Sequence, residues 1–184
     1  LNRTMSIRRL SARHLSTSSG GLFPISARAS ALLEGDDAAL DPRVPACLER
    51  LTARRADHCW HKHSTFKQHL HGVWRVLALW RRSTELARCG LYHSAYSNSY
   101  VNLAIFDVHG GDRAVVRDDL GEAAEALVYK FCTIPRHELL TRVLPPMLDA
   151  DGGGGGLPAQ GVETRHIASG APVTLSRAEL RDFL

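Results

Sequence analysis

Apolar residues recur at helical spacing through the middle of the chain. One stripe is formed by Phe66, Leu70, Val73, Trp74 and Leu77. This spacing is typical of a helix with one buried face. Thr65 comes just before the stripe, and Gln68 lies three residues after Thr65. This is the pattern of a capping box. The pattern therefore predicts a helix that begins after Thr65 and ends before a turn at 80–84.

The same reasoning predicts helices on both sides of this one. After the turn we predict a helix over 85–96, capped by Ser83 or Thr84. The buried face of this helix is formed by Leu86, Cys89, Gly90 and His93. A later stripe between Leu120 and Phe131 predicts a helix capped by Asp118 or Asp119. Asp41-Pro42 predicts the start of a helix that runs to about Ala56, and Pro135 opens one more. The apolar segment 101–108 is interpreted as a loop with some extended structure, because His109-Gly110-Gly111 follows at once.

The last part of the chain is organised differently. Residues 149–158 contain five consecutive glycines and predict a flexible linker. Segments 163–167 and 172–175 flank Ser169-Gly170 and predict a small β-hairpin. Ser176 and Glu179 form a second capping box, which predicts that a helix starts at Arg177. We therefore expect an all-α helical domain over 41–148, the linker 149–158, and a hairpin with the start of a helix over 159–184 that packs on the domain.

The first 33 residues have the composition of a targeting segment. They are rich in Arg and Ser, and the first acidic residue is Glu34. The segment Arg13-His14-Leu15-Ser16-Thr17 resembles a mitochondrial processing site, with Arg two residues before the cut. Residues 1–33 therefore predict a transit peptide for the mitochondrion, with the chloroplast as the alternative. Because the chain begins with Leu1, a basic tail without an address, on a cytoplasmic protein, stays open as well.

The tail also accounts for the charge of the chain. Its five arginines contribute more positive charge than the whole net charge of +4, so the remaining residues are close to neutral together. A basic surface for nucleic acid is therefore not expected. No run of about 18 apolar residues occurs, so no membrane-spanning segment is expected either.

Histidines are concentrated in one part of the sequence, with six of the ten between His58 and His93. Histidine is a common metal ligand and a general acid or base. His69 lies near the start of one predicted helix and His93 near the end of the next, so antiparallel packing brings them to the same end. His63, just before the first helix, belongs to that end as well. The sequence predicts a cluster of His63, His69 and His93, with hydrogen-bonded core roles as the alternative, and it leaves His58, His61 and His71 at the surface.

The four cysteines do not have the spacing of a metal site. Cys47, Cys89 and Cys132 fall on apolar helix stripes, where a free cysteine behaves as a small hydrophobic residue. We expect no disulfide and no cysteine-based zinc site.

Several motifs resemble the HD superfamily. The segments from His69 to Leu77 and from Ala87 to Ser94 resemble the His-x-x-x-Val helix and the His-Asp helix of (p)ppGpp hydrolases. A closer resemblance is to an uncharacterised HD-like family that carries His-Ser instead of His-Asp. The matching segments are His63-Ser64, His69-Leu70-His71-Gly72, Cys89 to Tyr96, and Leu120 to Leu127. The segment from Gly170 to Leu184 also resembles the end of that family.

This resemblance implies an HD-like helical bundle and a specific set of site residues. In HD enzymes two His and two Asp hold a divalent metal that activates water. The resemblance places His69 and His93 at the two His ligands and Ser94 at the first Asp, where a neutral hydroxyl lowers metal affinity. His63 can take the place of the lost Asp. Among the acids that follow, namely Asp118, Asp119, Glu122 and Glu125, the family pattern favours Glu125, although helical spacing points it away from the apolar stripe.

Two hypotheses about function follow. The first is a metal-dependent hydrolase of a phosphate ester or nucleotide, with one Mn, Fe or Zn ion on His63, His69 and His93. Its catalytic residues are Glu125 as acid/base, together with Ser94 and Tyr96. The second is a metal-free, non-catalytic domain that binds a small anionic molecule or a protein partner. Arg113 and Arg117 are the candidate ligand-binding residues, since guanidinium suits phosphate.

Overall fold

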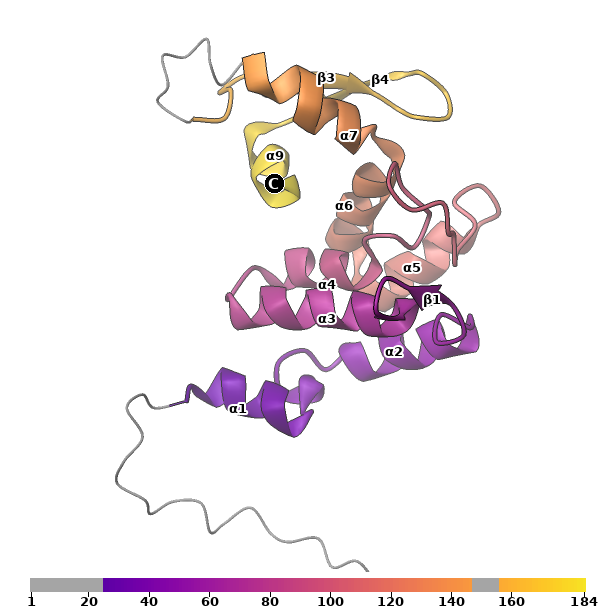
Figure 1. The fold of residues 1–184 in the computed structure, drawn as a ribbon, viewed down its shortest axis with the longest axis vertical. Coiled ribbons are helices and arrows are strands. Elements are labelled where there is room, and N and C mark those ends of the chain that lie inside the picture. The colour runs from indigo at the N-terminus through magenta and orange to yellow at the C-terminus, as the bar shows by residue number, and fades with distance from the viewer. Residues whose placement is uncertain (1–24, 147–155) are drawn as a thin grey trace, which may run out of the picture.

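The computed structural model describes residues 25–146 and 156–184 (Figure 1). The chain is mostly helical and carries two small antiparallel hairpins. Its elements are α1 (Ala27–Glu34), η2 (Asp37–Ala39), α2 (Val44–Ala53), β1 (Trp60–His61), β2 (Ser64–Thr65), α3 (Phe66–Leu79), α4 (Thr84–Tyr92), α5 (Asp112–Leu120), α6 (Glu122–Thr133), α7 (Arg136–Glu138), the π-helical η3 (Leu139–Val143), β3 (Val162–Arg165), β4 (Pro172–Leu175) and α9 (Arg177–Phe183).

The α3–α4 pair is the centre of the fold. The predicted capping box of α3 is confirmed: Gln68 N donates to Thr65 Oγ1 over 3.2 Å, and Thr65 N donates to the Gln68 side chain over 3.0 Å. Ser83 caps α4, also as predicted. The two helices approach closely because α4 has a glycine at the contact. A Cβ added to Gly90 would overlap with Leu77 Cδ1.

α4 ends at Tyr92, four residues earlier than predicted. The chain turns there, with Ala95 N donating to Tyr92 O, and it forms a single antiparallel bridge between Tyr96 and Ala104. His93 is thus the C-terminal cap of α4 rather than a residue inside the helix. This position leaves its side chain free to turn toward α3.

The last part of the expected tail belongs to the helical body. Residues 1–24, which make up most of the predicted transit peptide, lie outside the described residues, whereas α1 begins at Ala27 after a Ser26 cap. Leu32 of α1 is buried, Arg28 donates to Ala78 O over 3.1 Å, and Arg75 donates to Leu32 O. The folded part therefore starts before residue 41.

α5 was not predicted, and the assignment of Asp118 and Asp119 as helix caps was wrong. Both residues lie in the last turns of α5, and α6 begins after Gly121 without a side-chain cap. Gly121 has φ 90° and ψ 158°, a conformation open essentially to glycine alone. It separates the two helices, while Asp119 binds Arg50 and accepts a hydrogen bond from Tyr92.

The C-terminal elements form a second, smaller hydrophobic core. The predicted hairpin is confirmed, with Val162 opposite Leu175 and Arg165 opposite Pro172. The capping box of α9 is confirmed as well. α9 packs on α6 through Phe183, whose ring centroid lies 5.6 Å from that of Phe131. Most of the predicted linker 149–158 lies outside the described residues.

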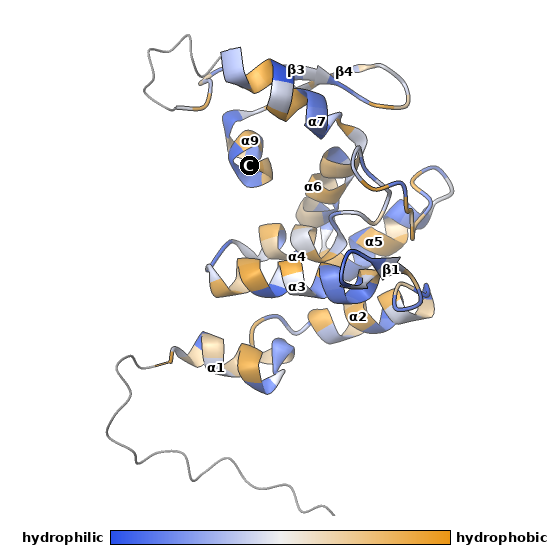
Figure 2. Ribbon diagram, in the orientation of Figure 1, coloured by the Kyte–Doolittle hydropathy of each residue, from blue (hydrophilic) through white to orange (hydrophobic). Residues whose placement is uncertain are grey.

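Figure 2 shows how polarity is distributed over this arrangement. The start of α3, beside β1, is polar, and the second half of α3 is hydrophobic. Within residues 25–146 and 156–184, no helix is long and apolar enough to cross a bilayer.

Replacing Gly121 tests the glycine break between α5 and α6. Gly121→Ala is expected to lower the free energy of unfolding by about 2 kcal/mol, because alanine is strained at this backbone conformation. Gly72→Ala is the control, since an added Cβ there meets nothing within 4 Å and the residue is helical. Urea unfolding of both variants measures the difference. Equal stabilities would contradict the assignment.

Candidate functional site

Three imidazole rings lie in a row at one end of the α3–α4 pair. His61 comes from β1, His69 from the first turns of α3, and His93 from the end of α4. The ring centroids of His61 and His69 are 4.9 Å apart, and those of His69 and His93 are 5.2 Å apart. The Nε2 atoms of His69 and His93 approach to 3.3 Å. We call these three residues the histidine row.

His93 is held in a defined orientation. Its Nδ1 lies 2.7 Å from Gly90 O. Because a carbonyl oxygen only accepts, Nδ1 carries the proton and donates a hydrogen bond to it. In the neutral ring, Nε2 then has a lone pair directed at His69. The Phe131 ring packs edge-on against His93 at 5.8 Å. Burial lowers the pKa of His93 to about 4 and also lowers the pKa of His69, so both rings are neutral at pH 7.

Positive charge accompanies the histidine row. The Arg136 guanidinium lies 3.6 Å above the Phe131 ring. The same Phe131 ring contacts His93. The positive charges of Arg136 and Lys62 help to lower the pKa of His93, after burial and the neighbouring His69. Nε of Arg136 and Nε2 of His61 are both buried and have no hydrogen-bond partner among the described residues. Each of these two nitrogens therefore has unused hydrogen-bonding capacity.

The structure places His61, rather than His63, beside His69. His63 is exposed in the two-residue turn between β1 and β2, after Lys62 at φ 56°. His61 was expected at the surface and is instead half-buried against Phe66, at 5.4 Å between ring centroids. The short hairpin, which periodicity did not reveal, decides this exchange.

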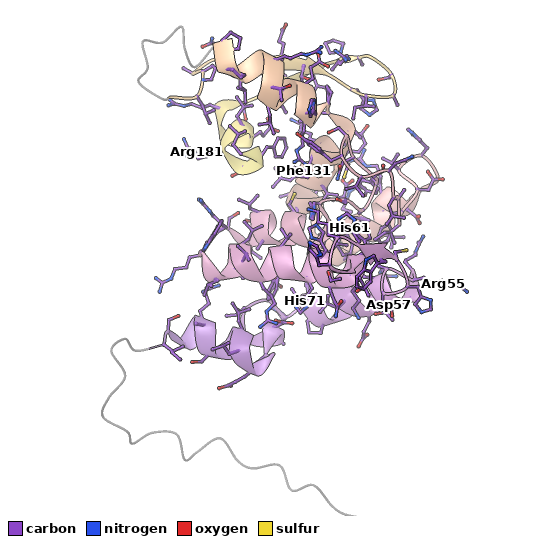
Figure 3. The ribbon with its side chains drawn as sticks, viewed as in Figure 1. Arg55, Asp57, His61, His71, Phe131 and Arg181 are labelled. Carbon is purple, nitrogen blue, oxygen red and sulfur yellow. The ribbon has the colours of Figure 1, made fainter. Side chains whose placement is uncertain are left out.

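His71 lies apart from the histidine row. Figure 3 shows His61 on the same side of α3 as Phe131, whereas His71 lies on the side of η2. His71 was expected at the surface and is instead partly buried, with its Nε2 2.7 Å from a carboxylate oxygen of Asp37. Its contact therefore links α3 to η2 rather than to the row.

The predicted catalytic residues lie in other surroundings. Ser94 is 1% exposed, and its hydroxyl accepts a hydrogen bond from Asn98 over 2.7 Å. Glu125 is also 1% exposed, although its helical position pointed away from the apolar stripe. Its carboxylate accepts a hydrogen bond from Tyr96 over 3.1 Å. The helix α5, missing from the prediction, supplies the charges that allow this burial.

Arg113 and Arg117 face Glu125. Arg113 binds both carboxylate oxygens, at 2.7 and 2.9 Å, and Arg117 lies at 3.8 Å. Arg113 also stacks 3.7 Å above the Tyr129 ring. Glu125 precedes Cys132 by seven residues on α6, about 10 Å along the helix axis, and Cys132 is the residue that donates to His93 O. The Glu125 cluster and the histidine row are therefore separate.

Sequence reasoning missed Arg136, Lys62 and His61 as site residues. Arg136 directly follows Pro135, where a helix was predicted to start. Nothing in the sequence at this position indicates that the Arg136 guanidinium lies over the Phe131 ring. No group of three or more His, Cys, Asp or Glu side chains in the described ranges is arranged to hold a metal ion. The clearest signal in the sequence was the density of histidines before α3.

Residues 50–136 match the family model described as "Domain of unknown function (DUF6817)". The histidine row, Lys62 and Arg136 all fall within this segment, and Arg136 is its last residue. No curated protein and no solved structure matches the chain.

The pKa of His93 gives a test of its burial. Because folding disfavours protonation of His93, the unfolded chain takes up the proton first as the pH falls. Stability from the neutral ring is complete above pH 6.5 and is lost progressively toward pH 4. The expected loss is up to about 3 kcal/mol. Urea unfolding of the wild type and of His93→Gln at pH 7 and pH 5 measures it. An identical pH dependence in both proteins would contradict the assignment.

Proposed function

We propose that the protein is an HD-like helical domain that binds a small phosphorylated anion at the histidine row. The observation that carries this proposal is the buried Nε of Arg136, which has no partner among the described residues. A buried donor without a hydrogen bond costs free energy, and an anion that accepts from it removes that cost. Guanidinium suits phosphate because it donates two parallel hydrogen bonds.

The surrounding groups support an anion as the ligand. Lys62 and Arg136 bring positive charge to the row. His61 adds a second buried nitrogen without a partner in the described part of the chain. A phosphate group has enough acceptor oxygens to contact several of these donors at once.

The HD-like assignment rests on the motifs and on where their histidines lie. His69 and His93, the residues that resemble the two His ligands, are in contact. Catalysis through Glu125 has less support, because Arg113, Arg117 and Tyr96 already occupy its carboxylate. The Ser94 hydroxyl already accepts a hydrogen bond from Asn98. These contacts favour the binding function over the hydrolase.

A metal-dependent hydrolase is the second candidate, and one distance favours it. Two imidazole nitrogens on a tetrahedral zinc ion lie about 3.3 Å apart, and the Nε2 atoms of His69 and His93 have this separation. The hydrogen bond from His93 Nδ1 to Gly90 O is the kind of outer contact that orients a metal ligand. An all-nitrogen donor set suits zinc better than manganese. A bound zinc ion would activate water for hydrolysis of a phosphate ester.

The anion site is tested with pyrophosphate in the presence of EDTA, which excludes a metal-mediated contact. Calorimetry is expected to show binding to the wild type and a loss of affinity of at least about tenfold in Arg136→Gln, because one charge-assisted contact is removed. Arg142→Gln is the matched control, since Arg142 is exposed and lies six residues farther on. Unchanged affinity in Arg136→Gln would overturn the proposal.

The metal candidate is tested by zinc analysis after refilling and desalting. If His69 and His93 hold zinc, equimolar zinc is retained by the wild type and by His63→Ala, because His63 lies outside the row. His69→Ala and His93→Ala are expected to lose it. Zinc retained by both of these variants, or absent from the wild type, would exclude the site.

A further inference from the structure

The Arg136 guanidinium is held by aromatic rings rather than by an acid. Its Cζ atom lies 3.6 Å from the centre of the Phe131 ring and 5.3 Å from the centre of the Tyr100 ring. Across the described segments, no aspartate or glutamate forms an ion pair with it. The face of an aromatic ring attracts a cation at these distances, because its π electrons make the face negative. Tyr100 is therefore a second contact that holds this charge in place.

The backbone of Tyr100 is fixed by one side chain, that of Asn98. Asn98 Oδ1 accepts a hydrogen bond from Tyr100 N over 2.8 Å and another from Val101 N over 3.0 Å. Asn98 Nδ2 donates to the Ser94 hydroxyl over 2.7 Å. Ser94 is 1% exposed and directly follows His93 in the chain. Asn98 thus ties Tyr100 to the same buried segment that carries His93.

Core packing contributes little to the position of Tyr100. The residue is 52% exposed. Besides Arg136, its ring contacts the His137 ring edge-on, with 5.8 Å between the centroids. An exposed side chain keeps much of its conformational freedom unless other contacts restrict it. The contact between Tyr100 and Arg136 therefore depends on the Asn98 anchor.

We propose that Ser94, Asn98 and Tyr100 are positioning residues of the anion site. Together they hold the Arg136 guanidinium in the orientation that binds the phosphate. This inference rests on the proposed function and adds the residues that orient its main charged contact. A guanidinium that is already oriented loses less conformational entropy when it binds a ligand.

The first test needs no ligand. NMR relaxation of the Arg136 Nε–H group is expected to show a rigid guanidinium in the wild type and in Tyr100→Phe, which keeps the aromatic ring. The group is expected to become more mobile in Tyr100→Leu and in Asn98→Ala. Asn102→Ala is the matched control, since Asn102 is exposed in the same segment. An Nε–H group that stays as rigid as in the wild type in both variants would overturn the inference.

The second test measures pyrophosphate affinity in EDTA by calorimetry. Tyr100→Leu, Asn98→Ala and Ser94→Ala are each expected to weaken binding at least about threefold, the size of one cation–π contact. Tyr100→Phe and Asn102→Ala are expected to keep the affinity of the wild type. Because Asn98 acts through Tyr100, the double variant of Asn98→Ala and Tyr100→Leu is expected to bind no more weakly than Tyr100→Leu alone. Additive losses in the double variant would overturn the positioning role.

The outcomes separate this inference from the proposed function. Binding that depends on Arg136 but not on Tyr100 or Asn98 would overturn this inference and leave the anion site standing. Absence of pyrophosphate binding to the wild type would overturn the anion site, and with it the positioning role.

Discussion

The close approach of α3 and α4 governs the geometry of the site. Gly90 leaves no side chain between α4 and the Val73–Leu77 face of α3, so the two backbones come near each other. The same contact brings His69 and His93 together at one end of the pair. Gly90 also accepts the hydrogen bond that orients His93. One small residue thus sets both the helix spacing and the direction of a site residue.

Burial then determines the chemistry of the histidine row. Removing imidazole from water disfavours its charged form, which lowers the pKa of His93 and keeps the ring neutral at pH 7. Neutral rings can donate, accept or bind a metal, and the nearby cations favour an anion. The contact of Arg136 with Phe131 places a charge beside the row without a hydrogen-bond partner for its Nε among the described residues.

The Glu125 cluster shows how a buried acid can be structural. Its carboxylate is paired by Arg113 and Tyr96, which offsets the cost of removing it from water. The cluster links α5 to α6 across the Gly121 break. An acid at a position that a resemblance marks as functional can therefore serve mainly to hold two helices together.

The helices with strong local signals could be predicted from the order of residues alone. The capping boxes at Thr65 and Ser176, the cap at Ser83 and the hairpin around Gly170 depend on neighbouring residues, which the sequence contains directly. Which side chains meet was decided by tertiary packing instead. The β1–β2 hairpin selected His61 over His63, the pairing with α5 buried Glu125, and packing over Phe131 placed Arg136. These outcomes depend on how neighbouring elements fold back on one another across turns, which periodicity along one helix does not contain.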